Sequence, residues 1–124
     1  MKTFRLEKTK SSPEVLLDPN GVVKLRGRSI LENSAEFFEP VIEWVDTYVQ
    51  SPADLTCVDI DLEYFNSATA KFIITLIQRV SRVGLKNRRY KVNWYYEDGD
   101  EDILERGEYI SSVLESDFNF IKIR

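Results

Sequence analysis

The sequence of 124 residues contains no histidine and a single cysteine, Cys57. Histidine is the usual general base near neutral pH and the commonest transition-metal ligand, so its absence weighs strongly against hydrolase and zinc chemistry. One cysteine also excludes an internal disulfide framework. Since no histidine is present to activate a nucleophilic thiolate, we expect Cys57 to be a buried or half-buried packing residue.

Glycine is scarce and scattered, with five residues at positions 21, 27, 84, 99 and 107. Glycine-rich loops of the P-loop or dinucleotide-binding type are therefore absent, and we expect no nucleotide and no other cofactor to bind the chain by itself. No stretch resembles a secretory signal or a membrane-spanning helix, so cytoplasmic residence is the default expectation.

The charge balance favours a protein partner. The chain has 17 basic and 21 acidic residues, a net charge of −4, whereas nucleic-acid and anionic-membrane surfaces need clustered lysine and arginine. We expect the one basic cluster to balance acids on a neighbouring element. That cluster comprises Lys86, Arg88, Arg89 and Lys91.

Hydrophobic spacing predicts one α/β domain over residues 1–124, in the order β-β-α-β-α-β-α-β. Because helices alternate with strands, we expect a mixed β-sheet with the helices mainly on one face. Residues 1–12 form either a short strand or an arm. The expected strands are 14–18, 22–28, 55–64, 90–96 and 118–123, and the expected helices are 34–50, 69–83 and 100–114.

Several single residues are expected to shape these helices. Asn33 and Glu36 have the spacing of a capping box, with Ser34 as the alternative cap and Phe37 following in the core. Gly84 is expected to end the second helix at a positive φ angle, as glycine commonly does after a helix. Gly107 interrupts the third helix and indicates close packing.

Acidic and apolar residues alternate in the strand 55–64. Val58, Ile60, Leu62 and Tyr64 are expected on one face, and Cys57, Asp59, Asp61 and Glu63 on the other. A face carrying three carboxylates should be open to water. Their spacing of about 7 Å is wide for one ion and no calcium loop accompanies them, so we assign no metal and expect Arg89 and Lys91 to balance them. A carboxylate- or metal-dependent domain that uses Asp59, Asp61 and Glu63 is the alternative hypothesis.

Asn66 and Ser67 stand where this strand passes into the second helix. Both residue types are favoured helix caps, so one hypothesis is a structural subunit in which Ser67 is only a cap. The other is a switch, because a phosphate on Ser67 would meet free N–H groups and the positive end of the helix dipole.

Several segments together resemble the SiaC-type bacterial regulatory phosphoproteins. These are small proteins whose fold resembles the STAS fold of anti-sigma-factor antagonists. The resemblance covers nearly the whole chain and depends on the order and spacing of the segments. They are Ser12-Pro13-Glu14-Val15, Leu17-Asp18-Pro19, Gly27-Arg28-Ser29-Ile30, Glu32-Asn33-Ser34-Ala35-Glu36-Phe37-Phe38, Leu62-Glu63-Tyr64-Phe65-Asn66-Ser67 and Trp94-Tyr95-Tyr96-Glu97-Asp98.

The resemblance implies a non-enzymatic partner-switching protein. A cognate kinase would phosphorylate the hydroxyl after Asn66, a PP2C-type phosphatase would reverse this, and the unphosphorylated form would bind a target. In the family's best-known system that target is a diguanylate cyclase, which makes cyclic di-GMP. The implied acceptor is Ser67, with Thr69 as the alternative. The implied partner-binding residues are Asn66, Ala68, Thr69 and Lys71, together with Glu32, Asn33 and Ser34.

Two positions depart from the family's pattern. Ala68 follows the acceptor where the family often has a second hydroxyl residue, and Leu31 stands where a proline commonly precedes Glu32. Neither departure removes the acceptor.

Overall fold

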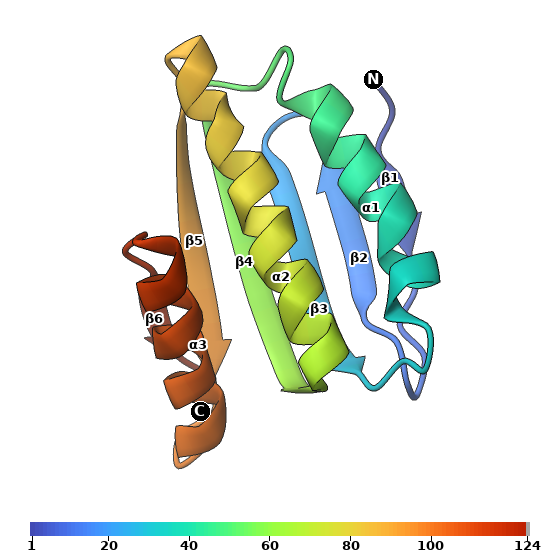
Figure 1. The fold of residues 1–124 in the computed structure, drawn as a ribbon, viewed down its shortest axis with the longest axis vertical. Coiled ribbons are helices and arrows are strands. Elements are labelled where there is room, and N and C mark those ends of the chain that lie inside the picture. The colour runs from blue at the N-terminus through green and yellow to red at the C-terminus, as the bar shows by residue number, and fades with distance from the viewer. Residues whose placement is uncertain (124) are drawn as a thin grey trace.

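A sheet and a layer of helices make up the computed structural model, which describes residues 1–123 (Figure 1). The strands are β1 (Phe4–Leu6), β2 (Glu14–Asp18), β3 (Val22–Ser29), β4 (Leu55–Phe65), β5 (Arg89–Tyr96) and β6 (Asn119–Lys122). The helices are α1 (Ser34–Tyr48), α2 (Ser67–Val80) and α3 (Glu101–Leu114), and a 3₁₀ helix, η1 (Ser81–Lys86), follows α2.

The strands lie in the sheet in their order along the chain, from β1 to β6. β1, β2 and β3 are antiparallel, whereas β3 to β6 run parallel to one another. Each parallel pair is joined through a helix, and right-handed crossovers that all step in one direction place their helices on one face. Figure 1 shows α1, α2 and α3 on the same side of the sheet. The predicted mixed α/β fold is confirmed, and β1 realises the short-strand alternative for residues 1–12.

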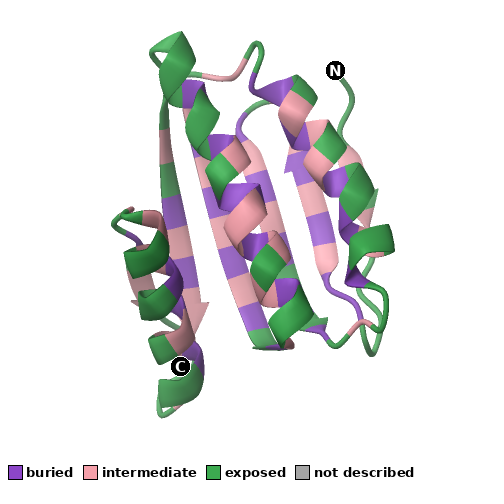
Figure 2. Ribbon diagram, viewed as in Figure 1, coloured by how far each residue is buried: buried purple, intermediate pink, exposed green. Residues whose placement is uncertain are grey.

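The core lies between the sheet and the three helices. Alternate residues of the central strands point toward the helices and are buried, which gives the alternating colours along the strands in Figure 2. Removal of these apolar side chains from water is the main force that holds the two layers together. The largest fully buried side chains come from the strands (Leu17, Leu25, Ile60, Phe65 and Trp94) and from the helices that cover them (Phe38, Tyr48, Ile73, Leu76 and Ile77).

The helix-free face of the sheet is polar, as predicted. Lys24, Asp59, Asp61 and Tyr95 are half-buried there, and Arg26 is exposed. This face therefore remains in contact with water.

Helix α1 begins at Asn33, as the capping-box spacing predicts. The Asn33 side chain accepts a hydrogen bond from the Glu36 N–H (3.1 Å) and donates one to the Glu36 carboxylate (3.2 Å). The prediction of Phe37 in the core holds in part: Phe37 is half-buried and packs against the core, with its ring edge-on to that of Phe38 at 4.9 Å, whereas Phe38 is fully buried. Both residues continue an apolar helical spacing, so periodicity alone could not choose between them.

The two glycine predictions had different outcomes. Gly84 lies inside η1 without a positive φ angle, and Asn87 takes the left-handed conformation (φ 58°) that ends this segment, so that prediction was wrong. A Cβ added to Gly107 would lie 2.5 Å from the Trp94 ring. The absence of a side chain at Gly107 therefore lets α3 approach β5 closely, as predicted.

Strand β4 contains a β-bulge near its end. Gly27 pairs with Leu62 and Arg28 with Tyr64, so Glu63 is an extra residue between the two pairs. A bulge shifts the side-chain alternation by one position. Tyr64 is consequently 48% exposed rather than directed into the core, which corrects the prediction for this residue.

Candidate functional site

Hydrogen bonds of Asn66 join two segments that lie 35 or more residues apart in the sequence. The Asn66 N–H donates to the carbonyl oxygen of Ser29 (3.0 Å), and its side-chain amide donates to that of Leu31 (3.1 Å). Leu31 directly precedes Glu32, Asn33 and Ser34. The structure thus brings the start of α1 and the start of α2 together at the carboxyl ends of β3 and β4, where open α/β sheets commonly bind ligands.

The cap of α2 is Asn66, whose side-chain oxygen accepts a hydrogen bond from the Thr69 N–H (2.9 Å). Ser67 is the first residue of the helix and is exposed, as is Ala68. The first backbone bond of the helix runs from the Ala70 N–H to the Asn66 carbonyl (3.0 Å). The N–H groups of Ser67 and Ala68 therefore have no intrahelical acceptor and point out from the helix end.

Thr69 and Ser34 are buried, unlike the other implied partner-binding residues. The Thr69 hydroxyl forms a hydrogen bond of 2.7 Å with the hydroxyl of Ser29, and both residues are fully buried. The Ser34 side chain is 4% exposed, and its oxygen has no hydrogen-bond partner within residues 1–123. Neither hydroxyl is open to a macromolecule. The remaining residues of the set are half-buried (Asn66) or exposed (Glu32, Asn33, Ala68, Lys71).

A cavity of about 320 Å³ separates the first turns of α2 from α3. Ser67 lies at this cavity, Phe65, Ala70 and Ile74 give it apolar walls, and Arg106 and Tyr109 line it from α3. Tyr109 is 67% exposed. The contribution of α3 was not predicted from the sequence; Tyr109, an aromatic residue directly after Glu108 on a strongly charged helix, was the available signal.

Arg106 joins α3 to the end of β4. Its Nη1 donates a hydrogen bond of 2.5 Å to the Phe65 carbonyl oxygen, and its guanidinium carbon lies 3.8 Å from the centre of the Phe65 ring. A planar guanidinium suits both contacts, because it donates in its plane and stacks on its face. The positive charge of Arg106 is thus held against Phe65, which precedes Ser67 by two residues.

The carboxylates of β4 are paired mainly with arginines of β3. Arg26 lies 3.8 Å from Asp61, and Arg28 lies 3.1 Å from Glu63. The prediction that Arg89 and Lys91 balance these acids was wrong, because the β4–β5 register places Arg89 beside Leu55 and Lys91 beside Cys57.

Asp59 takes its partners from β5. Its Oδ1 accepts hydrogen bonds from the Asn93 amide (2.8 Å) and the Tyr95 hydroxyl (3.4 Å). Burial, and secondly the negative charge of Asp59, raise the pKa of Tyr95 above its ordinary value of 10.0. Within residues 1–123, no group of three or more acidic, cysteine or histidine side chains is placed to hold a metal ion.

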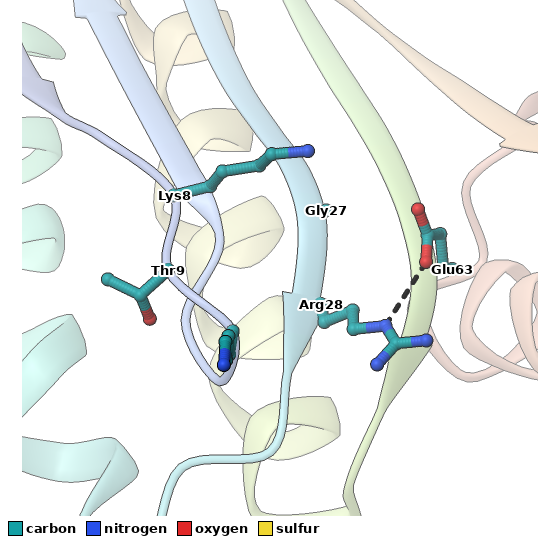
Figure 3. A pocket seen from close by; sticks show the side chains of 6 residues that line it. Lys8, Thr9, Gly27, Arg28 and Glu63 are labelled. Atoms are coloured by element: carbon teal, nitrogen blue, oxygen red, sulfur yellow. Dashed lines mark hydrogen bonds and ion pairs between the residues drawn. The ribbon is translucent and has the colours of Figure 1, made fainter.

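A shallow basic depression of about 570 Å³ lies over the bulge (Figure 3). Lys8, Lys10 and Arg28 line it, and Glu63 reaches Arg28 across it. Figure 3 shows the Lys8 side chain extending across the strand at Gly27. Because Glu63 forms an ion pair with Arg28, the depression is less positive than its three basic side chains alone would make it.

None of the helices within residues 1–123 has both the length and the apolar character needed to cross a membrane.

The chain matches known proteins over nearly all of its length. A sequence model of the family described as SiaC family regulatory phosphoprotein matches residues 6–123. An uncharacterised protein of Pseudomonas aeruginosa is 28% identical over 112 residues, which cover 87% of this chain and 86% of that protein.

Two solved structures share the fold. The structure of apo-SiaC from Pseudomonas aeruginosa is similar with a TM-score of 0.84 at 23% identity, and the match covers 100% of both chains. A chain in the structure of the diguanylate cyclase SiaD in complex with its activator SiaC, from the same organism, also gives a TM-score of 0.84. That match has 24% identity and covers 96% of this chain and 97% of the other. The resemblance to the STAS fold stays a prediction, because none of these matches addresses it.

Proposed function

Because the chain belongs to the SiaC family of regulatory phosphoproteins, we propose that it is a non-enzymatic partner-switching protein controlled by reversible phosphorylation of Ser67. A cognate protein kinase adds the phosphate, and a PP2C-type phosphatase removes it. The unphosphorylated form binds the target protein. All of these steps take place in the cytoplasm.

The observation that carries this proposal is the position of Ser67. Its side chain is exposed on the first turn of α2, next to two N–H groups that have no intrahelical acceptor. A phosphate adds about −1.5 to −2 charge units and three acceptor oxygens, and a helix N-terminus stabilises such a group. Phosphorylation can therefore change the surface here without unfolding the helix. Thr69 is a poor acceptor by comparison, because a kinase would first have to break its buried contact with Ser29.

A diguanylate cyclase is the proposed target, and cyclic di-GMP signalling is the proposed pathway. The support is the complex in which SiaC of Pseudomonas aeruginosa is the activator of the cyclase SiaD. On this chain, the proposed contact surface consists of the exposed and half-buried residues around Ser67. It comprises Glu32, Asn33, Asn66, Ala68 and Lys71.

Phosphorylation with purified components tests the acceptor. The protein is incubated with its cognate kinase and ATP, and phosphate is located by mass spectrometry. We expect one main site at Ser67 and no phosphorylation of Ser67→Ala. A main site elsewhere in the wild-type protein would contradict the assignment.

The alternative of a structural subunit without a switch makes a different prediction. If Ser67 only supports the helix, Ser67→Asp should leave both stability and partner binding unchanged. Under the switch hypothesis the same substitution preserves the fold and weakens binding, so one variant separates the two hypotheses.

A further inference from the structure

Arg106 is the cation best placed to meet a phosphate on Ser67. Both residues line the cavity between α2 and α3. The guanidinium group is anchored by the Phe65 carbonyl and the Phe65 ring. Among residues 1–123, Arg106 forms no ion pair with a carboxylate.

The Phe65 contacts hold the Arg106 guanidinium group in place without neutralising its charge. Carboxylates are available on its own helix, since Asp102 and Glu105 line the same cavity. Arg106 nevertheless stacks on a neutral ring and donates to a neutral carbonyl. One of the five donors of the planar guanidinium is used by Phe65, and the others are available for a bidentate acceptor such as a phosphate.

We propose that Arg106 receives the phosphate of Ser67 and thereby links α2 to α3 across the cavity. The proposal rests on the proposed function, because it takes Ser67 as the phosphorylated residue. The link adds an ionic contact between two helices that otherwise contact each other little. It also covers the apolar walls of the cavity, so the modified protein presents a different surface.

Three other charged residues near the site bear on this proposal. Asp102 and Glu105 are exposed, so water and salt screen their repulsion of the phosphate. Lys71 lies one helical turn after Ser67 on α2 and could pair with the phosphate along the helix. Lys71 does not line the cavity, however, and a pair within α2 would leave α3 untouched.

The test uses full-length protein with phosphoserine installed at position 67 during translation, so no kinase is needed. The melting temperature is measured with and without the phosphate in the wild type, in Arg106→Gln and in Lys71→Gln. Each variant serves as its own unphosphorylated reference, which removes the effect of the lost Phe65 contact.

We expect the phosphate to raise the melting temperature of the wild type by about 3 °C, because a partly exposed charged pair contributes modestly in a domain of this size. Most of the increase should disappear in Arg106→Gln and persist in Lys71→Gln. Arg106→Lys should keep part of it, since lysine preserves the charge and loses the planar donors.

Two results would overturn the proposal: an equal increase in the wild type and Arg106→Gln, or an increase that depends on Lys71. Neither result depends on which residue the kinase modifies, because phosphoserine is incorporated at position 67 during translation. Failure of the kinase to modify Ser67 would contradict the proposed function and leave the measured coupling to Arg106 intact.

Discussion

The side chain of Asn66 donates a hydrogen bond to the carbonyl oxygen of Leu31 over 3.1 Å, so the residue that caps α2 also holds the loop before α1. The same side chain uses its oxygen for the Thr69 N–H. One amide thus fixes two helix starts relative to each other. An aspartate could supply the acceptor but not the donor, which makes the two roles experimentally separable.

We expect Asn66→Ala to lower the free energy of unfolding by about 2 kcal/mol, since it removes both the cap and the partner of the Leu31 carbonyl. Asn66→Asp keeps the cap and should lose only about 1 kcal/mol. Urea denaturation monitored by circular dichroism measures both. Equal losses in the two variants would show that the cap contributes nothing measurable.

Thr69→Val should destabilise the fold by about 1 to 2 kcal/mol, because it leaves the buried Ser29 hydroxyl without its partner. The two side chains have similar shapes, so packing should change little. The extent of phosphorylation by the kinase should stay at the wild-type level when Ser67 is the acceptor. A large fall in phosphate content of the folded variant would instead favour Thr69.

Gly107→Ala should cost about 1 to 3 kcal/mol, because the added methyl group would overlap the Trp94 ring and force α3 away from β5. The better helix propensity of alanine offsets up to about 1 kcal/mol of this cost. Trp94 fluorescence should shift as the contact loosens. Gly84→Ala is the matched control, since its Cβ would meet no atom within 4 Å, and it should be neutral or slightly stabilising.

Regular periodicity accounts for what the sequence predicted correctly. Apolar residues spaced two apart located the central strands, and those spaced three to four apart located the helices. The short connections between these elements then left few possible topologies. The bulge at Glu63 was not predictable in this way. Acidic and apolar residues keep alternating through it, and only the pairing with β3 shows the extra residue.

Contacts between distant residues account for what was missed. The register of parallel strands is set by helix packing, so the sequence could not show that Arg26 and Arg28, rather than Arg89 and Lys91, face the acids of β4. Arg106 lies 41 residues from Phe65 along the chain. On an amphipathic helix it looks like any surface arginine, and only the fold brings it to the cavity that Ser67 also lines.

Stability should fall with rising pH through a window above the ordinary Tyr95 pKa of 10.0. Burial and the charge of Asp59 raise the pKa of Tyr95 in the folded state, so the folded protein holds this proton at pH values where the unfolded chain has lost it. The stabilising contribution is therefore complete below the unfolded pKa and is lost as pH rises through the folded one. Urea denaturation at about pH 8 and about pH 11 measures the change.

The matched variant for this experiment is Tyr95→Phe, which removes the titrating hydroxyl and keeps the ring. Its stability should fall less between the two pH values than that of the wild type. Other groups titrate in the same range and contribute to both proteins. The difference between the two proteins in the change of unfolding free energy from about pH 8 to about pH 11 therefore isolates Tyr95. An identical change of unfolding free energy in the two proteins would contradict the predicted effect of Tyr95.

Ser67→Asp should fold with wild-type stability, to within about 0.5 kcal/mol, because a carboxylate in the first turn of α2 interacts favourably with the helix dipole. Its binding to a purified diguanylate cyclase should be at least tenfold weaker, which corresponds to about 1.4 kcal/mol of lost binding free energy. Calorimetric titration measures the affinity.

Ala68→Asp separates the effect of position from the effect of charge. It adds the same charge to the same exposed helical turn, one residue further along the chain and outside the cavity that Arg106 lines. If a negative charge anywhere on this surface repels the partner, both variants should lose affinity equally. Ala68 belongs to the proposed contact surface, so its variant should also lose some affinity. The proposed switch requires a larger loss for Ser67→Asp, because of these two positions only Ser67 lines the cavity with Arg106, where an added charge can bring α2 and α3 together.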